Sequence, residues 1–552
     1  MSDRFPHASE SVFAVVVVLL LTGVVGCGGG SSHSNFVTPP PAGPPAINSL
    51  STTSGVFGGS VQILGSNFGG QQGSSTVTFN GTQASVAKWS DNAIVAKVPS
   101  GATSGNVVVT VGGTASNAVN FNVVALPTGS IALSNFGFQC GPGDPADCQG
   151  ASKGVITWPT TQAQPGLLRL HDAGTQWANM DQGGGNYSWS NLDQWLDLIA
   201  AHQPVEVAQV FTWVPCWAAP SPCTAPPTAP SGTSTPPGDL TQAGGSPSFK
   251  AFVSAFTTHC NANNHCVKDL IRYYEMWNEW DLSFHWTGTM QQVFWMVAPA
   301  STIIRTNVPN AVILMPSSTP DSPTGGTTDL QNWLSLEDAN LINGKHMSDW
   351  VNWHVYLTKG ANSATQTVTP EDQWTNYNAN FLSVQASNPN WQNAPWANTE
   401  TNFNGAPPPG LNYQCPSAQF TADDCTGQIV RWQLLHDSNG AAGVFWYKWN
   451  ETVGANQQYE TAYYYMMQYL AGGKFAGPCT FTPGGGVSIW TCNFTESDQK
   501  TGALWVWTPN ESGTSFTVPS GYVDYLDLTG NKTTVTSGQS ITIGVLPIML
   551  EQ

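Results

Sequence analysis

Two glutamates stand where apolar runs of the sequence end. Glu279 closes the segment Tyr274-Glu-Met-Trp-Asn-Glu, and Glu400 closes the segment Trp396-Ala-Asn-Thr-Glu. Breaking a glycosidic bond requires a proton for the leaving oxygen and stabilisation of an oxocarbenium-like centre, and two carboxyl groups in different environments supply both. The pair therefore predicts chemistry on sugars. A separation of about 5 to 5.5 Å would make it retaining, through a covalent glycosyl-enzyme.

Polar and aromatic residues crowd the same places. Asn278, beside Glu279, could hydrogen-bond a sugar hydroxyl next to the reacting carbon. Sugar rings present C–H faces that pack on aromatic rings, and the candidate platforms are Trp277, Trp280, Trp353, Tyr356, Trp446 and Tyr447. An isolated Asn-Glu pair is more often a polar loop, but its place after an apolar run, with a partner glutamate, favours function. We interpret Glu206, Glu275 and Asp281 as structural.

The segment 130–473 has the pattern of repeated strand–helix units, because apolar runs alternate with amphipathic stretches. The candidate strands are 131–138, 167–171, 205–214, 271–279, 311–316, 350–357, 396–403 and 443–449. The helix-like stretches between them include 190–202, 248–260, 290–307, 428–437 and 461–470. Eight such strands predict a (β/α)8 TIM barrel, in which reactive side chains lie at the carboxyl ends of the strands.

Both flanks of the barrel segment have a different pattern. Residues 45–125 contain short alternating apolar and polar runs broken by Gly and Asn, which predict a small immunoglobulin-like β-sandwich. Residues 474–552 return to short alternating strands, which predict a second, C-terminal β-sandwich. The expected fold is therefore multidomain, with a catalytic barrel between two β-sandwiches.

The N-terminus predicts export. Residues 12–26 are almost entirely apolar, and at about 15 residues they are too short for a membrane span of about 20. We therefore expect residues 1–26 to be a signal peptide and residues 27–44, rich in Gly, Ser and Pro, to be a flexible tether. Val24-Val25-Gly26-Cys27 resembles the lipobox of bacterial lipoproteins, which implies lipidation of Cys27. The protein would then be anchored to the bacterial outer membrane or cell surface; with a plain secretory signal it would be periplasmic or extracellular.

Charge and cysteine content exclude some classes of partner. The formal net charge is −18, which would repel a phosphate backbone, so we expect no nucleic-acid partner. The cysteines other than Cys27 fall into five close couples: Cys140/Cys148, Cys216/Cys223, Cys260/Cys266, Cys415/Cys425 and Cys479/Cys492. Such spacings in an exported chain favour disulfides over a metal site. Connectivity does not follow from sequence, and pairing of neighbours is the simplest choice.

Residues 45–125 resemble an IPT/TIG immunoglobulin-like domain. The likeness rests on Pro45-Ala-Ile-Asn-Ser-Leu50, Gly58-Gly59, Gly65-Ser-Asn-Phe-Gly69, Phe79-Asn-Gly81 and Val98-Pro99. It implies a spacer or binding module.

The barrel segment resembles the (β/α)8 glycoside hydrolases of clan A. The resemblance rests on Asn278-Glu279, Glu400 and Trp446, at the ends of the fourth, seventh and eighth strands. Within the clan it resembles glycoside hydrolase family 39. The motifs are Leu168-Arg-Leu-His171, Asp349-Trp-Val-Asn-Trp-His-Val-Tyr356 and Thr399-Glu-Thr-Asn402.

This resemblance implies that Glu279 is the general acid/base and Glu400 the nucleophile. The candidate substrate-binding residues are then Asn278, Arg169, His171, His354, Tyr356, Trp446 and Trp280. Arg169 would support the nucleophile, although it could instead form a structural ion pair, and His171 could be a hydrogen-bonded core residue.

The sequence thus predicts a monomeric retaining glycoside hydrolase acting on a β-glycan or oligosaccharide, with no cofactor and no metal. The membrane would be contacted only through the lipid. The alternative is a non-catalytic surface carbohydrate-binding or adhesion protein. A serine hydrolase is disfavoured because the sequence has no Gly-x-Ser-x-Gly elbow.

Overall fold

The computed structural model describes residues 43–99, 101–124, 129–139, 158, 162–220, 223, 232–320, 325–357, 369–403, 415, 420–484 and 487–552. The expected signal peptide, Cys27 and the couple Cys140/Cys148 lie outside these residues.

Eight parallel strands form one sheet in the order β19-β18-β15-β12-β11-β22-β21-β20. Their bounds are β11 Phe136–Gln139, β12 Leu167–Leu170, β15 Glu206–Val210, β18 Tyr273–Glu275, β19 Val312–Leu314, β20 Val351–His354, β21 Trp396–Thr401 and β22 Ala441–Trp446. Parallel bridges join Leu314 to Trp350 and Ser318 to Trp353, so the two edges meet and the sheet is barrel-like. The prediction of eight strands is confirmed, and each is shorter than its apolar run.

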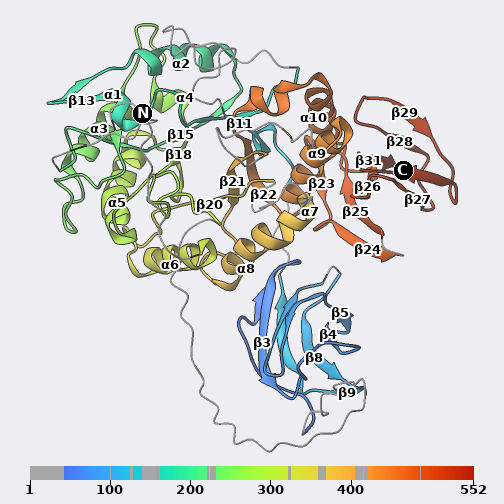
Figure 1. The fold of residues 1–552 in the computed structure, drawn as a ribbon. Coiled ribbons are helices and arrows are strands. Elements are labelled where there is room, and N and C mark those ends of the chain that lie inside the picture. Colours follow the sequence, from blue (N-terminus) through green and yellow to red (C-terminus); the bar gives the residue numbers. More distant parts are fainter. Residues whose placement is uncertain are drawn as a thin grey trace, which may run out of the picture. The chain divides into compact units, whose positions relative to one another are not determined.

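Helices lie around the outside of this sheet (Figure 1). The longer ones are α2 Ser190–Ala201, α3 Pro247–Thr258, α5 Met290–Asn307, α6 Gly326–Ala339, α8 Ala379–Ser387, α9 Ala422–Ser438 and α10 Gln457–Leu470. The short ones are α1 Trp177–Met180, α4 Val267–Leu270, α7 Pro370–Gln373, η1 Leu133–Asn135, η2 Trp374–Asn378, η3 Trp449–Glu451 and η4 Val453–Ala455.

Local sequence explains where several of these helices begin and which side they bury. Thr289 caps α5 by accepting a hydrogen bond from the backbone N–H of Gln292, whose side chain bonds back to Thr289. In α3, Phe249, Phe252, Val253 and Phe256 are buried at the i, i+3, i+4, i+7 spacing that places apolar side chains on one face.

Residues 45–123 form two small sheets. The first has the order β1-β3-β7-β6, and the second has β2-β10-β8-β4-β5 with β9 paired to β8. Their bounds are β1 Ala46–Leu50, β2 Ser54–Gly55, β3 Ser60–Ser66, β4 Thr76–Phe79, β5 Thr82–Gln83, β6 Val86–Trp89, β7 Ala93–Lys97, β8 Gly105–Val111, β9 Thr114–Ala115 and β10 Val119–Val123. Ile63 and Ile94 from the first sheet and Val107 and Phe121 from the second belong to one buried cluster. This is the arrangement of a sandwich.

The C-terminal strands form a seven-stranded sheet, with the path β23-β25-β26-β31-β28-β29 and β24 paired to β25, and a two-stranded sheet of β27 and β30. Their bounds are β23 Lys474–Phe475, β24 Thr480–Gly484, β25 Val487–Thr495, β26 Gly502–Trp507, β27 Thr514–Thr517, β28 Asp524–Leu526, β29 Lys532–Thr534, β30 Ser540–Ile543 and β31 Ile548–Glu551. Two further short antiparallel pairs are β13 Asp181–Gly183 with β14 Asn186–Tyr187, and β16 Val214–Pro215 with β17 Gly232–Thr233.

Four disulfides join neighbouring cysteines: Cys216–Cys223, Cys260–Cys266, Cys415–Cys425 and Cys479–Cys492. Neighbour pairing is therefore confirmed for these couples, and such bonds are typical of an exported protein. Among the described residues, no helix has both the length and the apolar character needed to span a bilayer.

Candidate active site

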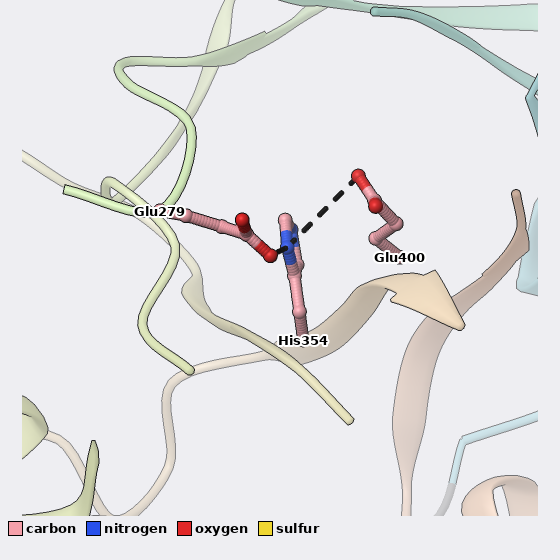
Figure 2. Close-up of side chains that lie close together, drawn as sticks. All are labelled: Glu279, His354 and Glu400. Atoms are coloured by element: carbon pink, nitrogen blue, oxygen red, sulfur yellow. Dashed lines mark hydrogen bonds and ion pairs between the residues drawn. The ribbon is translucent and has the colours of Figure 1, made fainter. Parts of the chain in front are cut away.

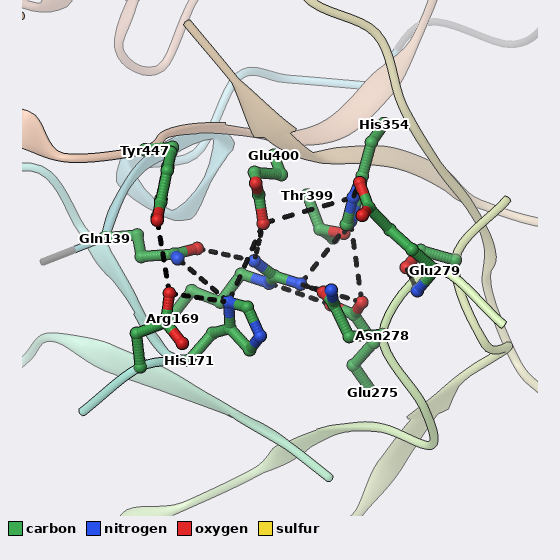
Figure 3. A network of polar contacts seen from close by, with 12 residues as sticks. Gln139, Arg169, His171, Glu275, Asn278, Glu279, His354, Thr399, Glu400 and Tyr447 are labelled. Carbon is green, nitrogen blue, oxygen red and sulfur yellow. Dashed lines mark hydrogen bonds and ion pairs between the residues drawn. The ribbon is translucent and has the colours of Figure 1, made fainter. Parts of the chain in front are cut away.

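Arg169 lies at the centre of a polar network at the carboxyl ends of the barrel strands (Figure 3). It belongs to β12 and is fully buried. Its Nε and Nη2 each donate to one oxygen of Glu275 at 2.9 Å, and its Nη1 donates to Oε2 of Glu400 at 2.8 Å. Nη2 also donates to Oδ1 of Asn278 at 2.8 Å, and Nη1 to Gln139. One guanidinium thus links strands β11, β12, β18 and β21.

The charges in this network hold one another in their ionised forms. Burial would lower the pKa of Arg169, but Glu275 and Glu400 outweigh it and raise the pKa. Burial would raise the pKa of Glu275, but Arg169 and then His354 outweigh it and keep the pKa well below its usual value. Glu275 is therefore the fixed counter-ion of Arg169.

Glu400 lies on β21 and is held by donors on both oxygens. Arg169 donates to Oε2, and the hydroxyl of Tyr356 donates to Oε1. His171 Nδ1 lies 3.7 Å from Oε2. The hydrogen bonds from Arg169 and Tyr356 fix the direction of the carboxylate.

Glu279 follows β18 by four residues, and its backbone is left-handed, with φ +43°. Its N–H donates to Oγ of Ser317 at 2.8 Å, which anchors the turn. His354 Nδ1 lies 2.9 Å from Oε1, and His285 Nδ1 lies 3.2 Å from Oε2. The carboxyl group is therefore placed between two imidazoles.

Figure 2 shows His354 between the carboxyl groups of Glu279 and Glu400. One carboxylate oxygen of each glutamate and one nitrogen of His354 all lie within 4.8 Å of one another. Three donor atoms this close could attract a divalent cation. However, Arg169 already places a positive charge 2.8 Å from Glu400, and His354 carries a second one. We therefore interpret the group as an acid–base centre.

The contact between Glu279 and His354 controls where a proton resides. Burial would raise the pKa of Glu279, but its contacts with His285 and His354 outweigh it, and the pKa lies well below its usual value. Burial would lower the pKa of His354, but Glu275 and Glu279 raise it to about 9. At neutral pH the proton of this pair lies on the imidazole.

The other predicted residues differ in how close they come to this centre. His171 is buried beside Glu400, and burial and then Arg169 lower its pKa to about 3, so it is a neutral imidazole. Its Nε2 has no hydrogen-bond partner among the described residues. Trp446, at the end of β22, is buried against Tyr463 and Phe403, and Trp280 packs against Trp333 of α6. Neither indole N–H donates a hydrogen bond to Glu279 or Glu400.

Sequence reasoning did not single out two residues of the network. His285 touches both Asn278 and Glu279, and Gln139 accepts from Arg169. Tyr447, expected as an aromatic platform, donates to Asp172 at 3.2 Å. Gln139 ends the first strand, so a systematic reading of every strand end could have found it. His285 lies in a loop and carries no such signal.

Residues 45–123 match the IPT/TIG domain family. These residues are an IPT/TIG domain. The IPT/TIG domain ends before β11, so it contributes none of the network residues described above.

No curated protein matches the chain. Similar solved structures include a family 39 glycoside hydrolase from Bacteroides cellulosilyticus, with 16% identity, a TM-score of 0.47 and coverage of 92% of this chain and 99% of that one. A glucosidase from Croceicoccus marinus has 11% identity, a TM-score of 0.47 and coverage of 77% and 97%. A family 51 α-L-arabinofuranosidase from Bifidobacterium longum has 11% identity, a TM-score of 0.44 and coverage of 78% and 98%.

Proposed function

We propose that the protein is a retaining glycoside hydrolase, with Glu400 as nucleophile and Glu279 as general acid/base. The observation that carries this proposal is the pair of buried carboxyl groups with oxygens within 4.8 Å of each other and with different partners. Retaining enzymes hold their carboxyl groups about 5 to 5.5 Å apart, whereas inverting enzymes need about 6.5 to 9.5 Å to admit a water molecule.

In the first step, a Glu400 oxygen forms a bond to the anomeric carbon while the bond from that carbon to the leaving oxygen breaks. Arg169 and Tyr356 hold the Glu400 carboxylate in position until it attacks. The leaving oxygen takes a proton from Glu279. Glu279 receives that proton from His354, across the 2.9 Å contact between Nδ1 and Oε1.

In the second step, water attacks the anomeric carbon and the bond to Glu400 breaks. Glu279 takes the proton of the attacking water and can return it to His354. Glu279 therefore needs both protonation states in one cycle, and a partner that exchanges one proton with it suits this requirement.

The site supports a neutral sugar as substrate, in agreement with a β-glycan or oligosaccharide. Arg169 directs its donors to protein acceptors, namely Glu275, Glu400, Asn278 and Gln139. It is therefore not available to bind the carboxylate of an acidic sugar. The neutral His171 has a free Nε2 that can bond to a sugar hydroxyl. Asn278, Tyr356, Trp446 and Trp280 are proposed as further sugar contacts.

We infer a domain organisation that suits an exported glycoside hydrolase. It consists of a signal peptide at 1–26, a tether at 27–44, an immunoglobulin-like domain at 45–125, the catalytic barrel at 130–473 and a β-sandwich at 474–552. Lipidation of Cys27 would anchor a monomeric enzyme to the outer membrane or cell surface. Four disulfides support export. Labelling with a radioactive fatty acid, compared between the wild type and Cys27→Ser, tests the anchor.

The activity is tested by a screen of the purified protein against aryl β-glycosides and β-glycan oligosaccharides. Each positive substrate is repeated with Glu279→Gln and Glu400→Gln, with Glu206→Gln as the control because Glu206 lies at the opposite end of its strand. We expect hydrolysis that both site variants reduce by at least about 10²-fold and that the control retains. NMR of the first-formed sugar should show retained anomeric configuration.

Absence of hydrolysis on the whole panel, with oligosaccharide binding that survives both substitutions, would favour a carbohydrate-binding or adhesion protein. Hydrolysis with an inverted product would contradict the roles proposed for the two glutamates while leaving the enzyme class intact.

A further inference from the structure

His285 occupies a fixed position beside Glu279. Its backbone N–H donates to the carbonyl oxygen of Leu282 at 2.9 Å, and its carbonyl oxygen accepts from the indole of Trp277 at 3.3 Å. Its ring packs against Trp213 and Phe284, with centroids 5.3 and 4.9 Å away. His285 is 8% exposed, so its position is set by the protein rather than by solvent.

The hydrogen bonds around Asn278 determine which nitrogen of His285 carries the proton. Arg169 has only donors, so the Asn278 side-chain atom 2.8 Å from Nη2 must be the amide oxygen. The amide NH2 group then faces Nε2 of His285 at 3.3 Å. Because NH2 can only donate, Nε2 must accept. The ring hydrogen of His285 therefore lies on Nδ1.

That hydrogen lies on the side of Glu279. Nδ1 is 3.2 Å from Oε2 of Glu279 and has no other partner among the described residues. A small rotation of the Glu279 carboxyl group would align the two groups for a hydrogen bond.

We propose that His285 is a positioning residue for Glu279: Arg169, through Asn278, holds it as the Nδ1–H tautomer so that it donates to the ionised carboxylate. It thereby stabilises the form in which Glu279 acts as base, while His354 supplies the proton for the acid form. The inference rests on the proposed function in naming Glu279 the acid/base, but the contacts themselves do not depend on it.

Other titratable groups also face this centre, and none of them is altered in the variants used for the test. They are Arg169 and Asp172 from β12 and the turn after it, Glu275 from β18, Asp281 from the loop of His285, His354 from β20, Glu400 from β21, and the neutral His171. Because they stay in place, a change measured on replacing His285 alone reports its own contact.

Two variants separate the donor from the ring. His285→Phe keeps the aromatic packing and removes the donor, whereas His285→Asn keeps a donor near the position of Nδ1 and removes the ring. His346→Phe is the matched control, because it removes an imidazole that contacts Asp338 at 2.8 Å and packs on Trp391 at 4.3 Å, outside the network.

The first measurement is the pH dependence of kcat/KM on an aryl glycoside. Loss of a donor to a carboxylate raises its pKa, so the limb of the profile that is set by Glu279 should move upward by about one pH unit in His285→Phe. It should stay in place in His285→Asn and in the control. An equal shift in both His285 variants would overturn the proposal, since the ring alone would then account for it.

Two further measurements are independent of any glycosidase activity. The first is an NMR titration of protein labelled with 13C at the side-chain carboxyl carbon of glutamate, in which the Glu279 signal is assigned with Glu279→Gln. The pKa of Glu279 should show the same upward shift in His285→Phe. Imidazole 15N shifts of the unaltered protein should show the Nδ1–H tautomer for His285, even if a variant fails to fold. An Nε2–H tautomer or an unmoved Glu279 midpoint would overturn the proposal, whereas an inactive wild type would count only against the proposed function.

Discussion

His354 Nδ1 lies 2.9 Å from Oε1 of Glu279, with both side chains buried. The other nitrogen of the ring, Nε2, lies 3.1 Å from the hydroxyl oxygen of Thr399. That hydroxyl donates its own hydrogen to Asn352 at 2.6 Å, so its oxygen accepts from Nε2–H. The Nε2 hydrogen is thus committed to Thr399, and the proton on the other side of the ring is the one exchanged with Glu279.

This pair predicts how stability depends on pH. The folded-state pKa of His354 is raised from 6.5 to about 9, so its contribution is fully present below pH 6.5 and is lost as the pH rises through about 9. The lowered pKa of Glu279 acts oppositely, and its contribution is lost in acid. We expect the stability of the wild type relative to His354→Gln to fall by up to about 3 kcal/mol across the alkaline window. Urea unfolding on both sides of this window measures it, and a difference independent of pH would refute it.

Asp281 predicts a pH dependence from a different cause. Burial raises its pKa from 3.8 to about 8, although the backbone N–H of Thr319 donates to it. Between these values the folded state keeps a proton that the unfolded state has released, so stability falls as the pH rises. Asp281→Asn should therefore gain stability over the wild type by at least about 2 kcal/mol between pH 4 and 8. The control is Asp498→Asn, because hydrogen bonds from Thr501 lower the pKa of this exposed residue to about 2, and its trend should be opposite.

Arg169 should be the residue whose loss destabilises the barrel most. Arg169→Met leaves Glu275 buried without its counter-ion, and breaking one partner of a buried pair costs about 3 to 5 kcal/mol. Arg169→Lys keeps the charge but not the forked guanidinium that bonds two carboxylates, so its stability should lie between those of the wild type and Arg169→Met. Chemical denaturation measures both variants. The double variant Arg169→Met/Glu275→Gln should recover part of the loss, and strict additivity of the two substitutions would show that the pair is not coupled.

The roles of the two glutamates can be distinguished by azide. In Glu400→Gly an azide ion can attack the anomeric carbon from the vacated side, so the glycosyl azide should have the inverted configuration. In Glu279→Gly azide replaces the water of the second step, so the product should retain the configuration of the substrate. Without azide, the activity of Glu400→Gly should be lower than that of the wild type by about 10⁴-fold or more. NMR identifies the products, and rescue of Glu275→Gln by azide would be inconsistent with its structural role.

The strands and several helices could be predicted from sequence because their signals are local. α5 has the predicted bounds Met290–Asn307, since the Thr289–Gln292 capping box marks its start and apolar spacing marks its buried face. α9 begins at Ala422, six residues before the predicted start at Gln428. Its first turn is polar, and the helix is buried nearly all round, so periodicity does not reveal it; the Thr421–Asp424 capping box does.

In the candidate site, the residues that could be predicted from sequence are those that the barrel strands position. Glu279, Glu400, Arg169 and His354 end or follow strands, and a closed parallel sheet brings strand ends together. His285 reaches Glu279 only because the loop that follows Glu279 turns back. The N–H of Leu282 donates to the carbonyl oxygen of Glu279, and the N–H of His285 donates to that of Leu282. No apolar period or motif records such a turn. Strand ends are therefore predictable, and contacts made by irregular loops are not.

The left-handed backbone of Glu279, with φ +43°, has an evolutionary consequence. This conformation is about 1 kcal/mol less favourable for a residue with a Cβ atom than for glycine. A descendant that no longer used the reaction would gain stability by replacing Glu279 with Gly or Asn. Among related sequences, this single position should therefore separate working enzymes from those in which selection for the reaction has ended.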